Sequence, residues 1–489
     1  MIWNTLSSLG LLMISSGCLA QDLFPLAVPR TNTFNASYGP LNPQQALQII
    51  KGANISSAQA EAVLTAVNFE RSNWAGSSTQ LDPFYSVTDL YPNASFLQPG
   101  TLIKVEQRTN ASLYTLPPGV ALSRFVFTTK MLNGTVIPAS AYVLWPWQRR
   151  RFKGVDGIPT VGWAHGTSGW SGECAPSHIR NLWYQYSAPF TLALQGYAVV
   201  APDYGGLGTD HDFAGNFIDH QYSANPAHGN DMIYAVQAAQ KAWPKRLSKD
   251  FVLMGHSQGG GAAWGAAENL AKDPVTGYLG TIAASPGVSA GDVVKLLAGQ
   301  PVVGSGLAKL AMGLSSIFPD FQLRDWLSDE GVRTTEALQK LQGCQSVGLE
   351  IHSSPNLLRG NAWNETYYLD AFDKLTRAGG KEFAGPMLVL QGSADSQAPA
   401  IVTSAVVNQT CRALPQSQLQ YVVVKGVDHV PVLFAGQQIW LDWIADRFNG
   451  VKVSDGCALV NNEAELEVEA YSAQIGYTLQ YALYPYEVA

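Results

Sequence analysis

The sequence has few charged residues and no long apolar segment. Asp, Glu, Lys and Arg make up 14% of the 489 residues and hydrophobic residues 46%, which excludes a disordered chain or a solvated helical rod. Lys and Arg number 30 against 37 Asp and Glu, and no basic patch supports nucleic-acid binding. No apolar run reaches the roughly 20 residues that cross a bilayer. These absences leave a globular chain, long for one domain but suited to an α/β enzyme with an insertion.

Cysteine is also scarce, and its distribution bears on the compartment. Residues 1–20 are predicted to be a secretory signal, because 9–15 are mostly apolar and 18–20 form a small-x-small cleavage site, although no basic residue precedes them. The mature chain then starts near Gln21 and keeps four cysteines, which predict two disulfides with three connectivities open: Cys174, Cys344, Cys411 and Cys457. Glycosylation sequons agree with a secreted, extracellular glycoprotein: Asn35, Asn54, Asn93, Asn110, Asn133, Asn364 and Asn408.

A serine in a G-x-S-x-G motif is the centre of the predicted chemistry. Ser257 follows the short apolar run 251–254, and 262–271 is rich in helix-forming residues. This order of strand, sharp turn and helix is typical of a nucleophile elbow. The flanking Gly255 and Gly259 are expected to avoid steric collisions with the neighbouring strand and helix. The sequence therefore predicts Ser257 as a nucleophile, with backbone N–H groups of the following helix close by.

Strands and helices alternate around this elbow and predict an α/β-hydrolase fold, with a mostly parallel central sheet flanked by helices. The predicted strands are 101–107, 124–130, 139–145, 158–164, 197–201, 279–285, 386–391 and 419–425. Helices are expected at 44–67, broken at Gly52, at 227–243 and at 434–448. The alternation stops in one apolar, helix-rich stretch, which predicts a helical cap inserted in the core. The expected organisation is signal 1–20, N-terminal segment 21–80, core 81–286, cap or lid 287–380, core 381–450 and C-terminal tail 451–489.

The acid and base partners of the serine are expected after later strands. Asp395 and His429 each follow a predicted strand by a few residues, in the chain order Ser, Asp, His of α/β-hydrolases. Asp428 is a rival acid, badly placed because it adjoins His429, and His352 is a rival base, which follows no core strand. Ser289 lies in a second G-x-S-x-G match. The fold expects one strand between the nucleophile and the strand that precedes the acid. The strand at 279–285 fills this place for Ser257, but no strand fills it for Ser289.

A loop upstream of the elbow is the expected source of the second oxyanion donor. Strand 158–164 runs into His165, Gly166 and Thr167, and the backbone N–H of Thr167, or of Gly166, is predicted to act with that of Gln258. His165 is expected to brace this loop. A later loop holds several potential metal ligands without any compact ligand spacing, so a hydrogen-bonded loop and no metal are predicted: His211, Asp212, Asp219, His220 and His228.

Taken together, several motifs resemble the secretory lipase family, the lipase-A-like α/β-hydrolases of fungi and actinobacteria. They are 82–85 with 99–102, 163–168 with 174–177, 203–208, 255–261, 391–395 and His429, within roughly residues 80–450. The resemblance implies hydrolysis of carboxylic esters, often acylglycerols, under a helical cap and without a metal or organic cofactor. It also implies a disulfide from the oxyanion loop to the cap, Cys174–Cys344, which leaves Cys411–Cys457.

The sequence thus predicts a secreted serine hydrolase, most simply a triacylglycerol lipase or carboxylesterase that forms an acyl-enzyme on Ser257. The expected partner is a small-molecule or lipid ester, with transient contact at a lipid interface, and the chain is expected to be a monomer. Alternatives are an esterase, deacetylase or acyltransferase acting on a small secreted metabolite ester, and a non-catalytic binding protein on a hydrolase scaffold. Ser257→Ala is expected to abolish hydrolysis, and Ser289→Ala is not.

Overall fold

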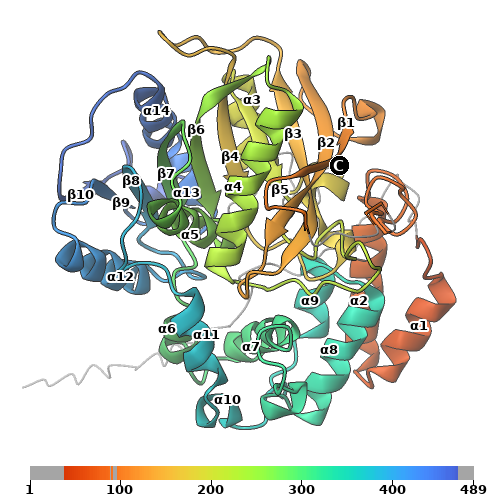
Figure 1. The fold of residues 1–489 in the computed structure, drawn as a ribbon. Coiled ribbons are helices and arrows are strands. Elements are labelled where there is room, and N and C mark those ends of the chain that lie inside the picture. The colour runs from red at the N-terminus through yellow and green to blue at the C-terminus, as the bar shows by residue number, and fades with distance from the viewer. Residues whose placement is uncertain (1–37, 89, 92–95, 472–489) are drawn as a thin grey trace, which may run out of the picture.

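The computed structural model describes residues 38–88, 90–91 and 96–471 (Figure 1). The predicted secretory signal 1–20 and the sequons at Asn35 and Asn93 lie outside the described residues, as does most of the Tyr-rich C-terminal segment. Within the described residues the fold is a single sheet with helices on both faces and a further group of helices at one edge (Figure 1).

The sheet has ten strands in the order β1-β2-β3-β5-β4-β6-β7-β8-β9-β10. All neighbours from β5 to β10 run parallel, and β1 to β3 form an antiparallel extension. The strands are β1 (Leu102–Glu106), β2 (Val120–Lys130), β3 (Val136–Pro146), β4 (Ile158–Ala164), β5 (Ala198–Pro202), β6 (Leu247–His256), β7 (Tyr278–Ala284), β8 (Met387–Gly392), β9 (Leu419–Val424) and β10 (Cys457–Asn462). The loops that follow the parallel strands therefore meet at one edge of the sheet.

Helices cover both faces of the sheet, which explains why its central strands are continuously apolar. On β6, Val252 and Met254 pack toward one face, whereas Phe251 and Leu253 pack toward the other. The first face is covered by α3 (Pro189–Leu194), α13 (Pro431–Ala435) and α14 (Gln437–Phe448). The second is covered by α4 (Asn225–Ala242), α5 (Gln258–Lys272) and α12 (Ala400–Ala413). The predicted α/β-hydrolase fold is confirmed.

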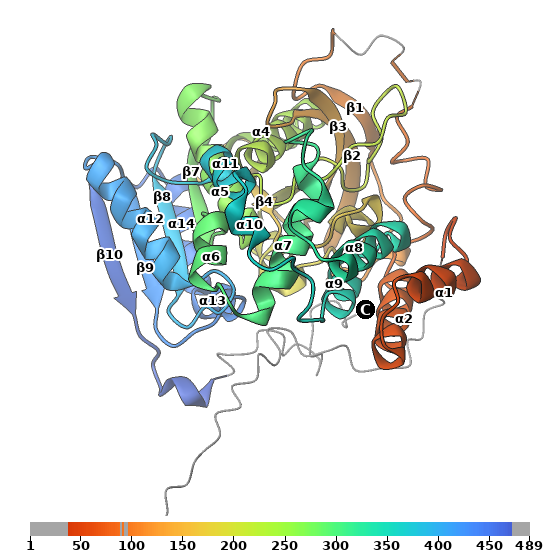
Figure 2. The ribbon, with the colours of Figure 1, turned by 90° about the horizontal axis from the view of Figure 1, so that it is seen from below.

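A group of helices between β7 and β8 forms the cap. It comprises α6 (Ala290–Leu296), α7 (Pro301–Leu314), α8 (Asp329–Leu341), α9 (Gln345–Ile351), α10 (Ala362–Glu365) and α11 (Tyr368–Thr376). Figure 1 shows these helices below one edge of the sheet, and Figure 2 shows α1 (Pro43–Gly52) and α2 (Ser57–Ser72) beside α8 and α9. Apolar residues of α1, α2, α8 and α9 form one buried cluster, so the N-terminal helices pack on the cap.

Two elements differ from the sequence prediction. The helix expected at 434–448 is instead two helices, α13 and α14, separated at Gly436, where the backbone leaves helical geometry and a Cβ would lie 2.7 Å from a methyl of Leu390. The strand β10 was missed within the predicted tail 451–489. Its residues are almost all exposed, Leu459 by 67%, so it carries none of the periodicity that burial imposes on a strand.

Candidate active site

Ser257 occupies a strained turn between β6 and α5. Its backbone has φ 60° and ψ −122°, a conformation that a residue with a side chain rarely adopts and that persists only when the surroundings hold it. The turn lifts the side chain out of the sheet and leaves it half-buried at the edge where the parallel strands end.

The two motif glycines keep this turn closed. A Cβ on Gly255 would overlap the backbone carbonyl of Gly259, and a Cβ on Gly259 would overlap the carbonyl of Ala164 in β4. The first contact keeps α5 close to the strand before it, and the second keeps α5 close to the neighbouring strand. Any larger residue at either position would therefore move Ser257 relative to the oxyanion loop that follows β4.

Asp395 and His429 come together in the loops after β8 and β9. The Nδ1 of His429 lies 2.9 Å from Oδ2 of Asp395, and both side chains are almost fully buried. Burial alone would raise the pKa of Asp395, but the charge and hydrogen bond of His429 outweigh it and hold that pKa below its usual value. The Nε2 of His429 has no hydrogen-bond partner among the described residues. His429 and Ser257 line the same pocket, so the arrangement suits a base that takes the proton of Ser257.

The rivals to these residues have other partners. Asp428 accepts hydrogen bonds from the backbone N–H groups of Ser396 and His429 at 2.9 and 2.7 Å, so it stabilises the loop that carries the histidine. His352 is buried in the cap, 3.1 Å from the hydroxyl of Thr335. Ser289 caps α6 by accepting from the N–H of Asp292 at 3.0 Å, so the second G-x-S-x-G match is a helix start.

Gly166, Thr167 and Gln258, the predicted oxyanion residues, lie close to Ser257. A Cβ on Gly166 would overlap the hydroxyl oxygen of Tyr184 and lie 3.2 Å from Cβ of Ser257, so a larger residue here would displace Tyr184 and crowd the serine. Thr167 and Gln258 both line the pocket. No described residue accepts a hydrogen bond from the backbone N–H of either one. These two donors are thus available to a ligand, which fits an oxyanion site.

A stack of buried rings holds the side chain of Gln258 in place, and this stack was not predicted from the sequence. His165, Tyr204, His228 and His220 stack in succession, with His220 and His228 nearly parallel and 5.0 Å apart. The side-chain amide of Gln258 donates to Nε2 of His220 at 3.2 Å and to Nδ1 of His228 at 3.3 Å. Each histidine must be neutral to accept, and burial lowers the pKa of His165 and of His220 to about 4 and that of His228 well below its usual value.

The sequence presents these loop residues as potential metal ligands, but their spacing predicts a hydrogen-bonded loop instead. Within the part of the chain that the structure describes, no group of three or more histidine, cysteine, aspartate or glutamate side chains is arranged to hold a metal ion. His220 and His228 accept hydrogen bonds from Gln258 and pack against each other and the ring of Tyr204.

His256, the residue before the nucleophile, connects the elbow to the base. Its Nε2 donates to the backbone carbonyl of His429 at 2.9 Å, and its Nδ1 accepts from the Tyr184 hydroxyl at 2.6 Å. Burial, helped by the adjacent His429, lowers the pKa of His256 to about 3 and keeps it neutral. The motif contained this residue only as an unspecified position, so sequence reasoning missed it.

The pocket over Ser257 lies between the core and the cap. It has a volume of about 310 Å³ and is lined on the core side by residues of the elbow, the oxyanion loop and the His429 loop. The cap side is mostly aliphatic, with α6 and α7 supplying most of it: Val293, Val294, Leu297, Val302, Val303 and Leu310. Its shape and apolar lining suit part of a small organic molecule.

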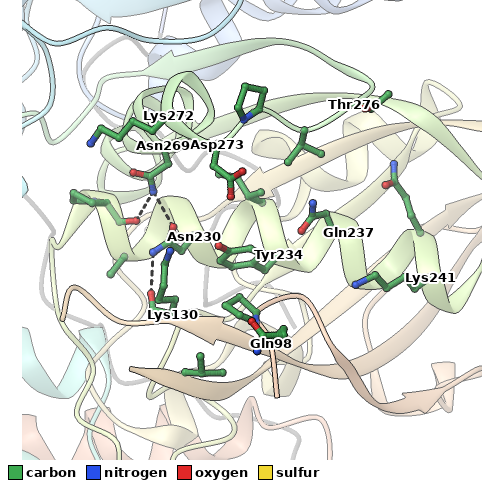
Figure 3. Close-up of a pocket in the computed structure, with 18 of the residues that line it drawn as sticks. Gln98, Lys130, Asn230, Tyr234, Gln237, Lys241, Asn269, Lys272, Asp273 and Thr276 are labelled. Carbon is green, nitrogen blue, oxygen red and sulfur yellow. Dashed lines mark hydrogen bonds between the residues drawn. The ribbon is translucent and has the colours of Figure 1, made fainter. Parts of the chain in front are cut away.

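A larger hollow of about 1630 Å³ lies elsewhere, between α4, the β2–β3 turn and the end of α5 (Figure 3). Several of its polar side chains form hydrogen bonds within the protein. Asn269 donates to Asn230, which in turn donates to the Lys130 carbonyl, while Lys241 donates to the Gly100 carbonyl. This surface joins elements to one another and lies apart from the serine.

The disulfide pairing implied by the family resemblance is confirmed. Cys174 pairs with Cys344, so the segment after the oxyanion loop is joined to the cap between α8 and α9. Cys411 pairs with Cys457, which joins α12 to β10.

The described sequon asparagines are all exposed: Asn54, Asn110, Asn133, Asn364 and Asn408. Among the helices of the described ranges, none has the length and apolarity to span a membrane.

Comparison with known proteins agrees with this architecture. The sheet, the elbow and the inserted cap define an α/β-hydrolase. Residues 162–439, more than half of the chain, match the alpha/beta hydrolase family, and the protein belongs to that family. No curated protein matches the sequence.

Solved structures are similar at low sequence identity. Lipase A of Candida antarctica has a TM-score of 0.63 at 18% identity, over 82% of this chain and 94% of that one, and its closed state has 0.60 at 18% identity, over 79% and 90%. A ligand-bound form of the rice cell wall degrading esterase LipA from Xanthomonas oryzae has 0.53 at 17% identity, over 72% and 98%. At these identities the likeness concerns the fold.

Proposed function

We propose that the protein is a serine hydrolase of carboxylic esters in which Ser257 is the nucleophile, His429 the base and Asp395 the residue that orients the base. The observation that carries the proposal is the 2.9 Å bond between His429 Nδ1 and Asp395 Oδ2, with Nε2 left without a described partner in the pocket that Ser257 lines. The strained backbone of Ser257 supports the same role, because such strain is usual at functional residues.

The chemistry follows from these positions. Ser257 attacks the ester carbonyl while His429 takes the hydroxyl proton and returns it to the leaving alcohol, and Asp395 stabilises the imidazolium. The N–H groups of Thr167 or Gly166 and of Gln258 hold the oxyanion, where one donor is typically worth about 3–4 kcal/mol of transition-state stabilisation. Water, activated by His429, then releases the acid from the acyl-enzyme.

The substrate is an ester with an apolar part that fits under the cap. The aliphatic wall of α6 and α7 supports this class, and so does the fold shared with a lipase and with an esterase. A triacylglycerol lipase or carboxylesterase is the first candidate function. Lys309 in the pocket wall favours a second candidate, an esterase for a small polar ester.

Secretion is part of the proposal. Two disulfides are typical of an oxidising compartment, and the exposure of every described sequon asparagine suits glycosylation on export. A loss of mass on treatment with an N-glycosidase, with the mature protein starting near Gln21, is the expected result.

Two measurements test the activity. A fluorophosphonate should label the folded protein and Ser289→Ala but leave Ser257→Ala unlabelled, and labelling of Ser257→Ala would refute the nucleophile. Hydrolysis of p-nitrophenyl esters from acetate to palmitate, with emulsified triacylglycerol alongside, then separates the substrate classes. Turnover of the emulsion with a maximum at long chains establishes a lipase, and a maximum at short chains without turnover of the emulsion establishes a small-ester esterase.

A further inference from the structure

We propose that Lys309 makes the cap wall of the pocket a binding site for a carboxylate, so that the substrate is an ester with an acidic group away from its scissile bond. The inference rests on the proposed function only in taking this pocket as the substrate pocket. It goes further by naming the chemical class that the pocket selects.

Lys309 is a buried cation with no counter-charge among the described residues. Its residue is only 8% exposed, on α7, and it lines the pocket together with Ser305 and Gly306 of the preceding turn. No described residue forms a salt bridge or a hydrogen bond with its ammonium group. Burial lowers the pKa of Lys309 to about 8, so the group is still mostly protonated at neutral pH. A buried charge of this kind is costly unless an anion or strong acceptor meets it.

Among the described residues, the ammonium has an aromatic ring beside it and no salt-bridge partner. Its nitrogen lies 5.3 Å from the ring centroid of Trp170, a weak cation–π contact that leaves its donors unused. The charge also acts on His352 of α9, where burial first and Lys309 second lower the pKa to about 3. His352 is therefore neutral and adds no second positive charge beside Lys309.

A second polar group in the same wall also lacks a partner. The side-chain oxygen of Gln345, at the start of α9, is buried without any hydrogen bond among the described residues, and Gln345 lines the pocket with Lys309. An amide can turn to donate or to accept, so beside an ammonium it adds a hydrogen bond to a bound carboxylate. Two polar groups left open in one apolar cavity point to a polar group on the ligand.

The rest of the pocket sets the size of that ligand. Apart from Lys309, no described lining residue carries a permanent charge, so an acidic substrate has a single place for its charge. A volume of about 310 Å³ is at the small end of ligand pockets and suits part of a small organic ligand. At Gly306, one turn before Lys309, a Cβ would meet nothing within 4 Å, so open space lies above the lysine on this helix face. A half-ester of a medium-length dicarboxylic acid fits these limits, whereas a triacylglycerol has no group for Lys309.

The test compares two series of p-nitrophenyl esters with acyl parts of four to ten carbons. One series ends in a methyl group and the other in a carboxylate. At the best chain length, Lys309→Met should lower the ratio of kcat/KM for the acidic ester to that for the neutral ester by 10- to 100-fold, because a hydrogen-bonded charge is lost. Turnover of the neutral esters should stay equal or rise. Lys295→Met is the matched control, since Lys295 is an exposed cap lysine paired with Asp370 outside the pocket, and it should leave the ratio unchanged.

A binding measurement separates this inference from the activity. In a Ser257→Ala background, dicarboxylic acids should bind more tightly than monocarboxylic acids of equal length, and Lys309→Met should remove that difference. If the wild type hydrolyses neither series but the binding difference holds, the carboxylate site stands and the proposed hydrolase does not. If neutral esters are hydrolysed and neither the ratio nor the binding responds to Lys309→Met, the carboxylate site is refuted. Lys309→Gln, expected to lose the same preference, serves if Lys309→Met does not fold.

Discussion

His220→Asn tests whether the buried histidine column makes the fold sensitive to acid. In the native protein Nδ1 of His220 donates to the Gly205 carbonyl at 3.0 Å, and Nε2 accepts from the Gln258 amide. An asparagine amide can replace the first bond but carries no group that protonates near neutral pH. The variant therefore removes one titrating group from the native and unfolded states alike.

The sign of the effect follows from the pKa. Burial lowers the pKa of His220 from 6.5 to about 4, so between these values the unfolded chain binds a proton that the native protein does not. The stability that His220 contributes is complete above pH 6.5 and is lost as the pH falls through 4. One proton corresponds to about 1.4 kcal/mol of unfolding free energy per pH unit. Over the 2.5 units from 6.5 to 4, His220 alone accounts for about 3 kcal/mol.

Denaturant unfolding at intervals between pH 7 and pH 4 measures this slope directly. At pH 7 we expect His220→Asn to be less stable than the wild type by about 1–3 kcal/mol, from the lost bond to Gln258 and the lost ring stacking. The difference should shrink as the pH falls, and the two curves should converge or cross near pH 4. Equal slopes for the two proteins over this range would refute the argument that His220 is held neutral by burial.

Three further predictions concern the oxyanion loop, the acid of the triad and a buried carboxylate. Gly166→Ala should lower kcat by about 10²- to 10³-fold, because its Cβ overlaps the Tyr184 hydroxyl and displaces the loop. Gly52→Ala, in open space on α1, is the control and should leave kcat unchanged. Equal activities of the two variants would exclude the loop from catalysis. Asp395→Asn should lower kcat by about 10⁴-fold with little loss of folded protein by circular dichroism, since it leaves His429 in the wrong tautomer. Burial raises the pKa of Asp231 to about 7, so this residue lowers the free energy of unfolding as the pH rises from 3.8 through 7. Asp231→Asn removes this loss, so the stability of the variant should rise more steeply with pH over that range than that of the wild type. A flatter curve for the variant would contradict this sign.

The fold could be predicted largely because its central strands are buried on both faces and therefore apolar throughout. The strand predicted at 158–164 matches β4, and the elbow helix begins directly after Ser257. β10 could not be predicted, since an exposed edge strand that pairs only through its backbone leaves no pattern in its side chains. The break at Gly436 depends on the approach of Leu390 from β8, a contact between residues far apart in the sequence.

The candidate site divides in the same way. Ser257, Asp395 and His429 could be predicted as candidates because each follows a strand, and the ends of parallel strands meet at one edge of the sheet. His256, Tyr184 and the histidines around Gln258 act through side-chain contacts that no local pattern encodes. Lys309 was hidden for another reason, because one lysine in an apolar helix usually extends to the surface, and only the packed cap reveals that this one does not.

The N-terminal helices α1 and α2 take part in ordering the pocket. Glu70 of α2 accepts hydrogen bonds from the backbone N–H groups of Cys344 at 2.8 Å and Val347 at 2.9 Å, at the start of α9. Cys344 is bonded to Cys174 beyond the oxyanion loop, and the N–H of Gln345 donates to the Ser168 carbonyl at 3.0 Å within that loop. A single short segment of the cap is therefore joined to α2, to the disulfide and to the oxyanion loop, so movement of any one of them shifts both the oxyanion donors and the polar part of the pocket wall.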